Sequence, residues 1–597
     1  MIIMGKLLFN LTFIILTQTF LSIRTSPLNI SNYSYPNPND PSVYYVAVLS
    51  VNDIHGVYFP STTTYLDKNN TTSYYESGGL DYLGKYISIM KREWGERFIF
   101  LDAGDQFQGG LETKISNGDI ITDFYNIMNL TAATFGNHEW DEGYEYLDTR
   151  LHKSTFPYLA CNIMNSTSNQ TEFLYNQLHY KIITIDKIKI GIIGLANNVV
   201  KETSNGKFKD VTFLNYVQRL TQMANEIRPQ VNAIIALGHV ALSCETEDSN
   251  SNIFELKVYN KATLQTKCDL NKEVAKLLKE LPPNTIDAFI TGHSHDVTHH
   301  WVYDVPVMSG KNFGLYTNIM YLPFDKETLS LINNDIQIEG PLPTCAKVFT
   351  SNHRCDSMTQ PQIDLSGELE EYTFHDVLIT KEESLLNHSE YWNDKYTKFK
   401  QDNVTSIDLP LEMNKHHENA LGNLYMDIYR RVTGADVAIT NAGSFKMKWN
   451  VGNISVADVY SMNPYDNCII CFEVNGKSLR RMLFEVQSGK LAFYPTSGVK
   501  QVVKVSPKKK LISVKLFDGV YEKEIDDMKM YKVTMVDFLY PHGGDDFNKV
   551  VKWLKVEGEI TWYRIEREEV LDYLRNVDKI EVEKLIDEYN PRLRIIP

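Results

Sequence analysis

Five short apolar runs in this chain each end in a residue that can bind a metal ion, next to a glycine. Two of these runs, residues 46–49 and 99–101, are typical of buried strands in a layered α/β fold, because they are continuously apolar. Ligands in such folds bind at the carboxyl edge of the sheet, where the strands end. The residues of ligand type that follow the runs are Asp53, His55, Asp105, Asn137, His239, His293 and His295.

This set combines carboxylates, one amide oxygen and imidazole nitrogens. Such a mixture suits borderline divalent metals such as Zn or Mn. A carboxylate shared by two ions is the simplest way to hold a metal pair close together, and we assign that role to Asp105. The pattern therefore predicts a site for two metals.

The motifs D-x-H, GD, GNH, GH and GHxH occur in this order, which resembles the calcineurin-like metallophosphoesterases. The segment NHEWD at 137–141 resembles NHEFD of the 5′-nucleotidase and apyrase family, with Trp140 in place of Phe. The C-terminal half is similar to that family too, with GNL at 422–424, NAGS at 441–444, NPY at 463–465 and GGD at 543–545. The resemblance thus extends from about residue 43 to the end of the chain.

The resemblance implies an α/β (α+β) architecture with a four-layer metallophosphoesterase sandwich and a C-terminal substrate-binding domain. We expect a signal peptide at 1–25, the phosphoesterase domain at 43–380, a linker helix at 381–403 and the nucleotide-binding domain at 404–597. Further helices are predicted at 80–94, 124–128, 213–227, 421–432, 479–487 and 566–588, and strands at 188–194, 437–440, 469–474 and 531–538.

The resemblance also implies roles for the metal-site residues. The first metal takes Asp53, His55, Asp105 and His295, and the second takes Asp105, Asn137, His239 and His293. Zn is the first expectation, with Mn, Mg or Co as alternatives. His138 and Asp141 are similar to the family's catalytic dyad, in which a protonated imidazole neutralises charge on the phosphoryl oxygens. The nearby carboxylate would orient His138 and raise its pKa.

Substrate residues are implied in the C-terminal domain. Tyr465 and Phe538 match the aromatic pair that sandwiches the base, and Asp545 matches the carboxylate that binds ribose hydroxyls. The predicted substrate set is Lys415, Asn441, Lys446, Tyr465, Phe538 and Asp545. Both lysines stand where the family has arginine, so the charge is kept while the bidentate geometry is lost. The family's glycine after the second-metal histidine is absent here, where Val240 follows His239. These departures leave the substrate open but not the metal chemistry.

Composition narrows the class of partner. The 597 residues suffice for two or more domains, and the 43% hydrophobic and 23% charged fractions are ordinary for a globular protein. The net charge of −15 argues against binding nucleic acid. An anionic substrate must therefore be held by local cations, either metals or a few lysines. A homodimer is compatible with the sequence.

The N-terminus predicts export. Residues 7–23 form an apolar stretch interrupted by polar residues, which favours a cleaved signal peptide over the alternative of an uncleaved anchor. No stable membrane span is expected, and the polar C-terminus carries no lipid-anchor signal. We therefore expect a secreted or lumenal protein. Sequons for N-glycosylation begin at Asn29, Asn32, Asn69, Asn70, Asn129, Asn165, Asn169, Asn387, Asn403 and Asn453.

Cysteines and the remaining histidines give further expectations. The pairs Cys244–Cys268 and Cys345–Cys355 would each close a short loop in an oxidising compartment. Cys161 is predicted to be a buried free thiol. The surface is the expected place for His299, His300, His416 and His417.

The leading hypothesis is a secreted, metal-dependent hydrolase of nucleotides, in particular a 5′-nucleotidase acting on nucleoside monophosphates. An apyrase-like or nucleotide-sugar hydrolase is the alternative among enzymes. A secreted nucleotide-binding protein without turnover is the alternative from another class, against which the intact ligand set argues.

Overall fold

The structure is a computed structural model that describes residues 35–596, apart from 67–71, 199–209, 246–256, 262–266, 351, 356–367, 415, 446–447, 464, 466, 490–492, 507, 542, 545–546 and 588. The expected signal peptide at 1–25 lies outside the described residues. The same holds for three residues of the predicted substrate set, Lys415, Lys446 and Asp545.

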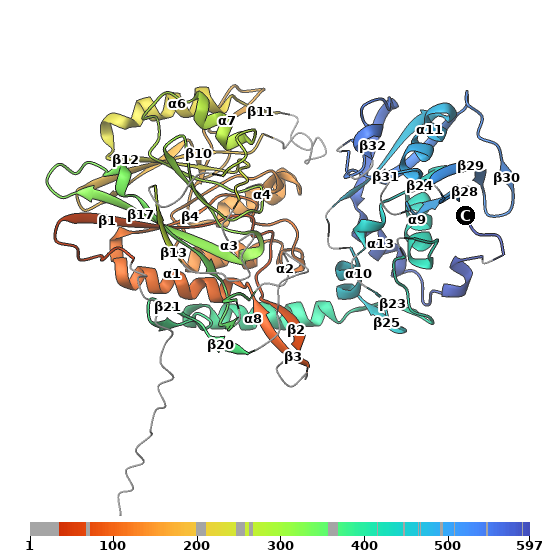
Figure 1. The fold of residues 1–597 in the computed structure, drawn as a ribbon, viewed down its shortest axis with the longest axis horizontal. Coiled ribbons are helices and arrows are strands. Elements are labelled where there is room, and N and C mark those ends of the chain that lie inside the picture. The colour runs from red at the N-terminus through yellow and green to blue at the C-terminus, as the bar shows by residue number, and fades with distance from the viewer. Residues whose placement is uncertain are drawn as a thin grey trace, which may run out of the picture.

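The N-terminal half contains two large sheets (Figure 1). The first has the strand order β13 (Lys257–Asn260), β18 (Gln337–Pro343), β17 (Tyr316–Asp325), β1 (Val43–Val51), β4 (Phe98–Asp102), β5 (Ala132–Thr134), β6 (Tyr158–Leu159), β8 (Gln177–Leu178). The second has the order β15 (Thr298–Val302), β16 (Val305–Ser309), β14 (Ala288–Ile290), β12 (Ala233–Gly238), β10 (Ile188–Leu195), β9 (Tyr180–Ile185). The strands that end at the predicted metal ligands are parallel neighbours, so their carboxyl ends share an edge in each sheet.

The two sheets pack face to face through one apolar core, in which Val48 and Leu101 of the first sheet meet Ile192 and Leu237 of the second. Helices α1 (Leu80–Trp94) and α3 (Asp119–Ile127) cover the outer face of the first sheet. Helices α6 (Tyr216–Ile227) and α7 (Glu273–Glu280) cover the outer face of the second. These are four layers, helix–sheet–sheet–helix, because each sheet buries one face against its partner and the other under helices. The expected four-layer α/β sandwich is confirmed.

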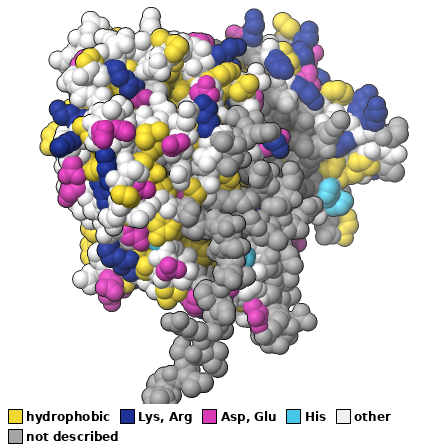
Figure 2. All heavy atoms as spheres, turned by 60° about the vertical axis from the view of Figure 1, so that its left-hand side comes forward, with side chains coloured by type: hydrophobic (Ala, Val, Ile, Leu, Met, Phe, Trp, Pro, Cys, Tyr) yellow, Lys and Arg dark blue, Asp and Glu magenta, His cyan; other side chains and the backbone are white. Residues whose placement is uncertain are grey.

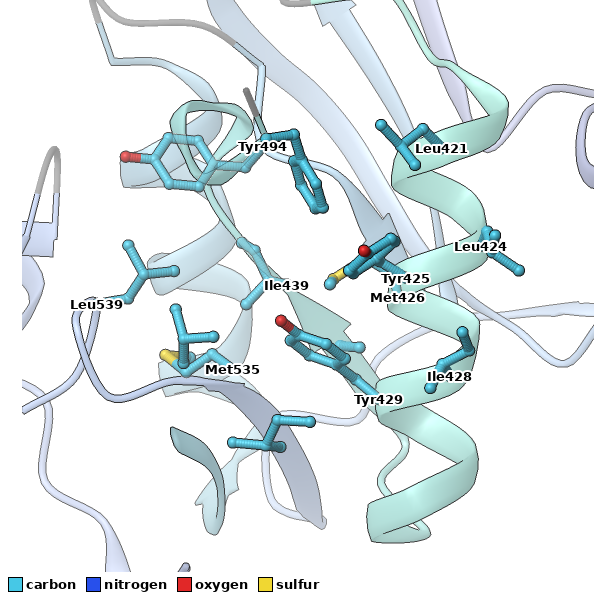
Figure 3. Close-up of a cluster of buried hydrophobic side chains, with 14 of the residues drawn as sticks. Leu421, Leu424, Tyr425, Met426, Ile428, Tyr429, Ile439, Tyr494, Met535 and Leu539 are labelled. Carbon is cyan, nitrogen blue, oxygen red and sulfur yellow. The ribbon is translucent and has the colours of Figure 1, made fainter. Parts of the chain in front are cut away.

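The C-terminal half has its own core. Its five-stranded sheet has the order β27 (Thr496–Ser497), β24 (Val437–Ile439), β31 (Met530–Val536), β26 (Cys468–Asn475), β32 (Glu557–Ile565), and its four-stranded sheet the order β30 (Glu522–Lys523), β29 (Lys510–Phe517), β28 (Val499–Lys504), β33 (Leu593–Ile596). The helices are α9 (Ala420–Thr433), α10 (Val456–Met462), α11 (Gly476–Gln487), α12 (Phe547–Val550) and α13 (Glu566–Leu574). Figure 3 shows Tyr425 and Tyr429 of α9 directed toward Ile439 of β24 and Met535 of β31.

Helix α8 (Leu386–Lys400) runs along the N-terminal half toward the C-terminal half (Figure 1). It contacts α2 (Leu111–Ser116) of the N-terminal half and α10 of the C-terminal half. Trp392 is its buried residue, and most of the remaining helix surface faces solvent. Within the described residues, no helix is both long and apolar enough to cross a bilayer.

Shorter elements complete the chain. Two-stranded pairs are β2 (Ser61–Leu66) with β3 (Thr72–Ser77), β7 (Ile163–Asn165) with β11 (Val211–Phe213), β19 (Lys347–Phe349) with β20 (Leu369–Glu371), β21 (Thr373–Phe374) with β22 (Val377–Leu378) and β23 (Asn403–Ile407) with β25 (Gly452–Ser455). Helix α4 (Tyr144–Lys153) follows the predicted dyad. On the face shown in Figure 2, basic and acidic side chains are interspersed over the described surface.

Several sequence predictions differ from the structure. The helix predicted at 213–227 begins at Tyr216, because Val211–Phe213 form β11. Helix α13 ends at Leu574 rather than 588, because the chain turns there with the N–H of Val577 bonded to the carbonyl of Leu574. His299 and His300 are buried, not at the surface, because β15, an edge strand of the second sheet, packs against β18 of the first. The ring of His299 stacks on Tyr259 with centroids 4.3 Å apart. His416 and His417 are exposed as expected.

The cysteine predictions hold. Cys244 is bonded to Cys268, and Cys345 to Cys355. Cys161 is a buried free thiol whose pKa is raised to about 12 by burial.

Candidate active site

The predicted metal ligands meet where strands of both sheets end. Asp53 and His55 follow β1, Asp105 follows β4, and Asn137 follows β5. From the second sheet, His239 follows β12, and His293 and His295 follow β14. Positive φ angles, between 50° and 76°, occur at Asp53, His55, Asp105, His293 and His295. Left-handed backbone at residues other than glycine is strained and gathers at functional sites.

The first ligand group consists of Asp53, His55 and His295. Oδ1 of Asp53 lies 3.3 Å from Nε2 of His295 and 3.8 Å from Nε2 of His55. The two imidazole Nε2 atoms are 3.0 Å apart. Three donor atoms therefore converge on one small volume, two of them from the loop after β1 and one from the loop after β14.

The second ligand group consists of Asp105, His239 and His293, whose ligand atoms all lie within 4.8 Å of one another. Oδ2 of Asp105 is 3.0 Å from Nε2 of His239 and 3.8 Å from Nε2 of His55 in the first group. This carboxylate thus lies between the two groups, where a ligand shared by two ions would have to be. Asn137 is buried beside it at the end of β5.

Neighbouring carbonyls orient the imidazoles. Nδ1 of His55 lies 2.9 Å from the carbonyl oxygen of Gln108, and Nδ1 of His239 lies 2.7 Å from that of Ala103. With the Nδ1 proton donated to a carbonyl, the Nε2 lone pair of a neutral imidazole points at the carboxylates, as in protein metal sites. Lone pairs and carboxylates facing one another require a cation between them. The donor set therefore fits a pair of divalent ions.

The charges of the cluster support the same conclusion. Burial disfavours a charged His239, but the carboxylates of Asp105 and Asp53 outweigh burial and raise the pKa of this imidazole to about 10. Burial lowers the pKa of His55 to about 4. The two carboxylates therefore favour a positive charge at this place.

A close backbone approach makes Gly136 necessary. A Cβ atom on this residue would lie 2.0 Å from Oδ1 of Asp105. Any side chain here would displace the carboxylate that lies between the two ligand groups. This explains the glycine directly before Asn137 in physical terms.

Sequence reasoning did not assign a role to Glu139. Its buried carboxylate accepts hydrogen bonds from the backbone N–H groups of Asp105 at 2.9 Å, Gln106 at 2.6 Å and Gly136 at 2.5 Å. One side chain thereby fixes the two loops that carry Asp105 and Asn137. In the sequence, only its position directly after His138 could have indicated a role for Glu139. Its contacts depend on the tertiary structure.

His138 and Asp141 lie on the turn that follows Asn137. Nδ1 of His138 is 2.6 Å from Oδ2 of Asp141, and the backbone N–H of His138 donates to Oδ1 of Asp105 at 2.9 Å. Burial lowers the pKa of His138, but Asp141 and Asp105 outweigh it and raise the pKa to about 10. The imidazole is therefore positively charged near neutral pH and sits beside the metal ligands.

The second domain, formed by the C-terminal half, exposes both aromatic side chains of the predicted substrate set. Phe538 is 38% exposed and Tyr465 is 42% exposed. Asp537, the residue before Phe538, is close enough to the dyad that the charge of Asp141 acts on it. Burial, with this smaller contribution, raises the pKa of Asp537 to about 7. Asn441 is buried at the end of β24 and accepts a hydrogen bond from Ser444 Oγ at 2.8 Å.

Comparison with known proteins decides the family. Residues 46–297 match the family model of the calcineurin-like phosphoesterases, and residues 397–552 match that of the 5′-nucleotidase C-terminal domain. The chain is a calcineurin-like phosphoesterase with a 5′-nucleotidase C-terminal domain. As a member of this family it is a hydrolase of phosphoric monoester bonds, and the family implies divalent metal ions.

Relatives of this phosphoesterase extend over most of its length. It is 24% identical to the NAD 5′-nucleotidase of Haemophilus influenzae, over 87% of this chain and 88% of the relative. It is 22% identical to the apyrase of Tabanus yao, over 79% and 81% of the two chains. A snake venom 5′-nucleotidase from Crotalus adamanteus is 24% identical, over 84% and 82%.

Solved structures share the fold of this phosphoesterase. A 5′-nucleotidase precursor from Thermus thermophilus matches with a TM-score of 0.56 at 19% identity, covering 93% of this chain and 99% of its own. The NAD nucleotidase of Haemophilus influenzae matches with a TM-score of 0.56 at 18% identity, with the same coverage.

Proposed function

We propose that this phosphoesterase is a secreted 5′-nucleotidase that removes phosphate from nucleoside monophosphates. The observation that carries the proposal is the geometry of the site, in which two metal-ligand groups lie beside the hydrogen-bonded His138–Asp141 pair. Phe538, in the second domain, is 38% exposed. An exposed aromatic ring beside a phosphoester site suits a nucleoside base.

Each part of the site has a proposed role. Two divalent ions, held by the two ligand groups, would activate a water and neutralise charge on the phosphoryl group. The positively charged imidazole of His138 would hold a phosphoryl oxygen, with Asp141 orienting it. Phe538 and Tyr465 would stack on the base, which contributes about 1–3 kcal/mol per base in comparable sites. Lys446 would hold a further anionic or ribose oxygen as a point charge.

Three features support the proposal of secretion. The apolar segment near the N-terminus has the pattern of a signal peptide. The two disulfides suit an oxidising compartment. Several sequon asparagines are exposed, as glycosylation requires, namely Asn129, Asn169, Asn387, Asn403 and Asn453. N-terminal sequencing and glycosidase treatment of the protein from a secreting eukaryotic host would test this point.

Hydrolysis of a substrate panel, followed both as phosphate release and by chromatography of the nucleotide products, tests the activity. The panel contains adenosine, uridine and guanosine monophosphates, ADP, ATP, NAD, UDP-glucose and p-nitrophenyl phosphate, each with and without a chelator. We expect the highest kcat/KM on monophosphates, loss with chelator and recovery with Zn or Mn. Preference for ADP and ATP would make the enzyme an apyrase, and preference for UDP-glucose or NAD a dinucleotide or nucleotide-sugar hydrolase. Binding of a nucleotide without its hydrolysis would mean a nucleotide-binding protein without turnover.

A further inference from the structure

Arg567, near the start of α13 in the second domain, is a buried cation with a specific set of contacts. Its side chain is 1% exposed. Nη1 donates to the backbone carbonyl of Tyr465 at 2.7 Å, and the guanidinium lies 4.6 Å from the ring centroid of Tyr460. Burying a guanidinium is costly unless it is paired. The hydrogen bond to the carbonyl of Tyr465 therefore holds the backbone at this residue, whose aromatic side chain is exposed.

Arg567 also reaches the catalytic side of the molecule. It lines a cavity of about 70 Å³ together with His138, Gln108, Lys114 and Glu142 of the first domain. The carbonyl of Gln108 is the group that orients His55. One arginine thus touches both the cavity next to the dyad and the loop of the proposed base-stacking residue.

The next residue of α13 links the domains directly. Glu568 lies 2.5 Å from Nζ of Lys114 on α2, and the same ammonium lies 2.9 Å from Glu142. Glu142 follows Asp141 of the dyad in the chain. Lys114 is partly buried, so the attraction to its two carboxylates is less screened than in a fully exposed pair. A charged bridge therefore joins the first turn of α13 to the segment that carries the dyad.

We propose that Arg567 is a positioning residue that holds the backbone at Tyr465 next to the phosphoester site. The ionic bridge formed by Glu568, Lys114 and Glu142 fixes the position of the two domains relative to each other. The proposal rests on the proposed nucleotidase function. Its consequence is specificity, because a preorganised aromatic ring loses less freedom when a base binds. The arrangement should lower the KM for substrates that contain a nucleoside, but not for a small aryl phosphate.

The test compares two substrates in two arginine variants. Arg567→Met keeps much of the apolar stem without the donor, and Arg567→Lys keeps the charge. We expect the KM for adenosine monophosphate to rise about tenfold in Arg567→Met and less in Arg567→Lys. The kcat/KM for p-nitrophenyl phosphate should stay within about twofold. Arg564→Met is the matched control, because Arg564 is exposed and pairs with Glu569 and Asp572 on the surface; both substrates should be unaffected.

A charge swap keeps the proposal testable if Arg567 variants do not fold. Glu568→Lys places two ammonium groups against each other, and we expect it to raise the KM for adenosine monophosphate about threefold to tenfold. Adding Lys114→Glu to this variant exchanges the charges of residues 568 and 114. One cation again lies between two carboxylates, so the KM for adenosine monophosphate should recover.

Three outcomes would overturn the proposal. An unchanged KM for adenosine monophosphate in both Arg567→Met and Glu568→Lys would remove the positioning role. An equal loss on both substrates in folded protein would make Arg567 purely structural. A wild-type enzyme that is active on p-nitrophenyl phosphate but on no nucleoside monophosphate would contradict both this inference and the proposed function, whereas active wild type with unaffected variants would contradict the inference alone.

Discussion

Oδ2 of Asp141 lies 2.6 Å from Nδ1 of His138, which points the imidazole into the cavity beside the metal ligands. We predict that His138→Ala retains its metals but lowers kcat by about 10²–10⁴-fold, as for the loss of a positioned acid or electrostatic group. Asp141→Asn should lower kcat less, because the imidazole remains but is less well oriented. Metal content by mass spectrometry and kcat must be measured on the same preparation. Loss of metal together with activity in His138→Ala would make this histidine structural.

Asp105→Asn tests the shared ligand. The carboxylate of Asp105 lies within 3.8 Å of imidazoles from both ligand groups, so removal of its charge affects both at once. We expect a fall in kcat of several orders of magnitude, as for removal of an essential group, and less than two equivalents of bound metal. Turnover close to that of the wild type in the folded variant would show that Asp105 does not bridge two metals.

Gly544→Ala tests whether Phe538 contacts the base. A Cβ atom on Gly544 would lie 2.4 Å from two atoms of the Phe538 ring, so the ring must move. Stacking on a base is worth about 1–3 kcal/mol, and we therefore expect the KM for nucleoside monophosphates to rise roughly tenfold. Activity on p-nitrophenyl phosphate is the internal control and should not change. If the KM is unaltered for every nucleotide, Phe538 lies outside the binding site.

His375 predicts a pH dependence of stability. Its buried ring lies 2.6 Å from Glu93 on α1 and 3.1 Å from Glu339 on β18, and it stacks on Tyr35. Burial lowers the pKa of His375, but the two carboxylates outweigh it and raise the pKa to about 9. The resulting stabilisation, about 3 kcal/mol, is complete below pH 6.5 and is lost as the pH rises through 9.

His375→Gln checks this assignment. The free energy of unfolding, measured in urea between pH 6 and 10, should fall with pH more steeply in the wild type than in the variant. Parallel pH profiles would show that His375 is not the titrating group. Tyr321 and Tyr372 also face this cluster, and the pKa of each is raised by burial, so neither titrates in the pH range of the experiment.

Glu566 is a second buried group with a consequence for stability. Within the described part of the chain, neither of its carboxylate oxygens has a hydrogen-bond partner, and burial raises its pKa well above the usual range. Its folded form is therefore the neutral acid. The cost of holding that proton is absent near pH 4 and grows by up to about 1.4 kcal/mol per pH unit above it. We predict that Glu566→Gln raises the melting temperature at pH 7 but not at pH 4; equal shifts at both values would contradict this.

Much of the first domain could be predicted from the residues alone. Helix α1 has the predicted bounds, Leu80–Trp94, because apolar residues recur at helical spacing between two glycines. The strands before Asp53, Asp105, His239 and His293 were recognisable because a buried strand is continuously apolar. Helix α13 was predicted too long, because its polar C-terminal residues continue a helical composition after the chain has already turned.

Histidines show where local reasoning fails. His299 and His300 are polar residues, yet both are buried on β15. Their burial depends on the strands that pair with and cover β15, which are not visible from neighbouring residues. Glu139 illustrates the same limit, since its three backbone donors come from two different loops.

The sequence by itself determined the fold class, the ligand types and their order, because strands, glycines and the residues that follow them are local in the chain. Only the tertiary structure decided which ligands lie together, that Asp105 lies between the two groups, and that Arg567 reaches both the Tyr465 loop and the cavity of His138. These relationships join segments far apart in sequence. They arise when sheets and helices bury their apolar faces against one another, and that packing sets the distances between side chains.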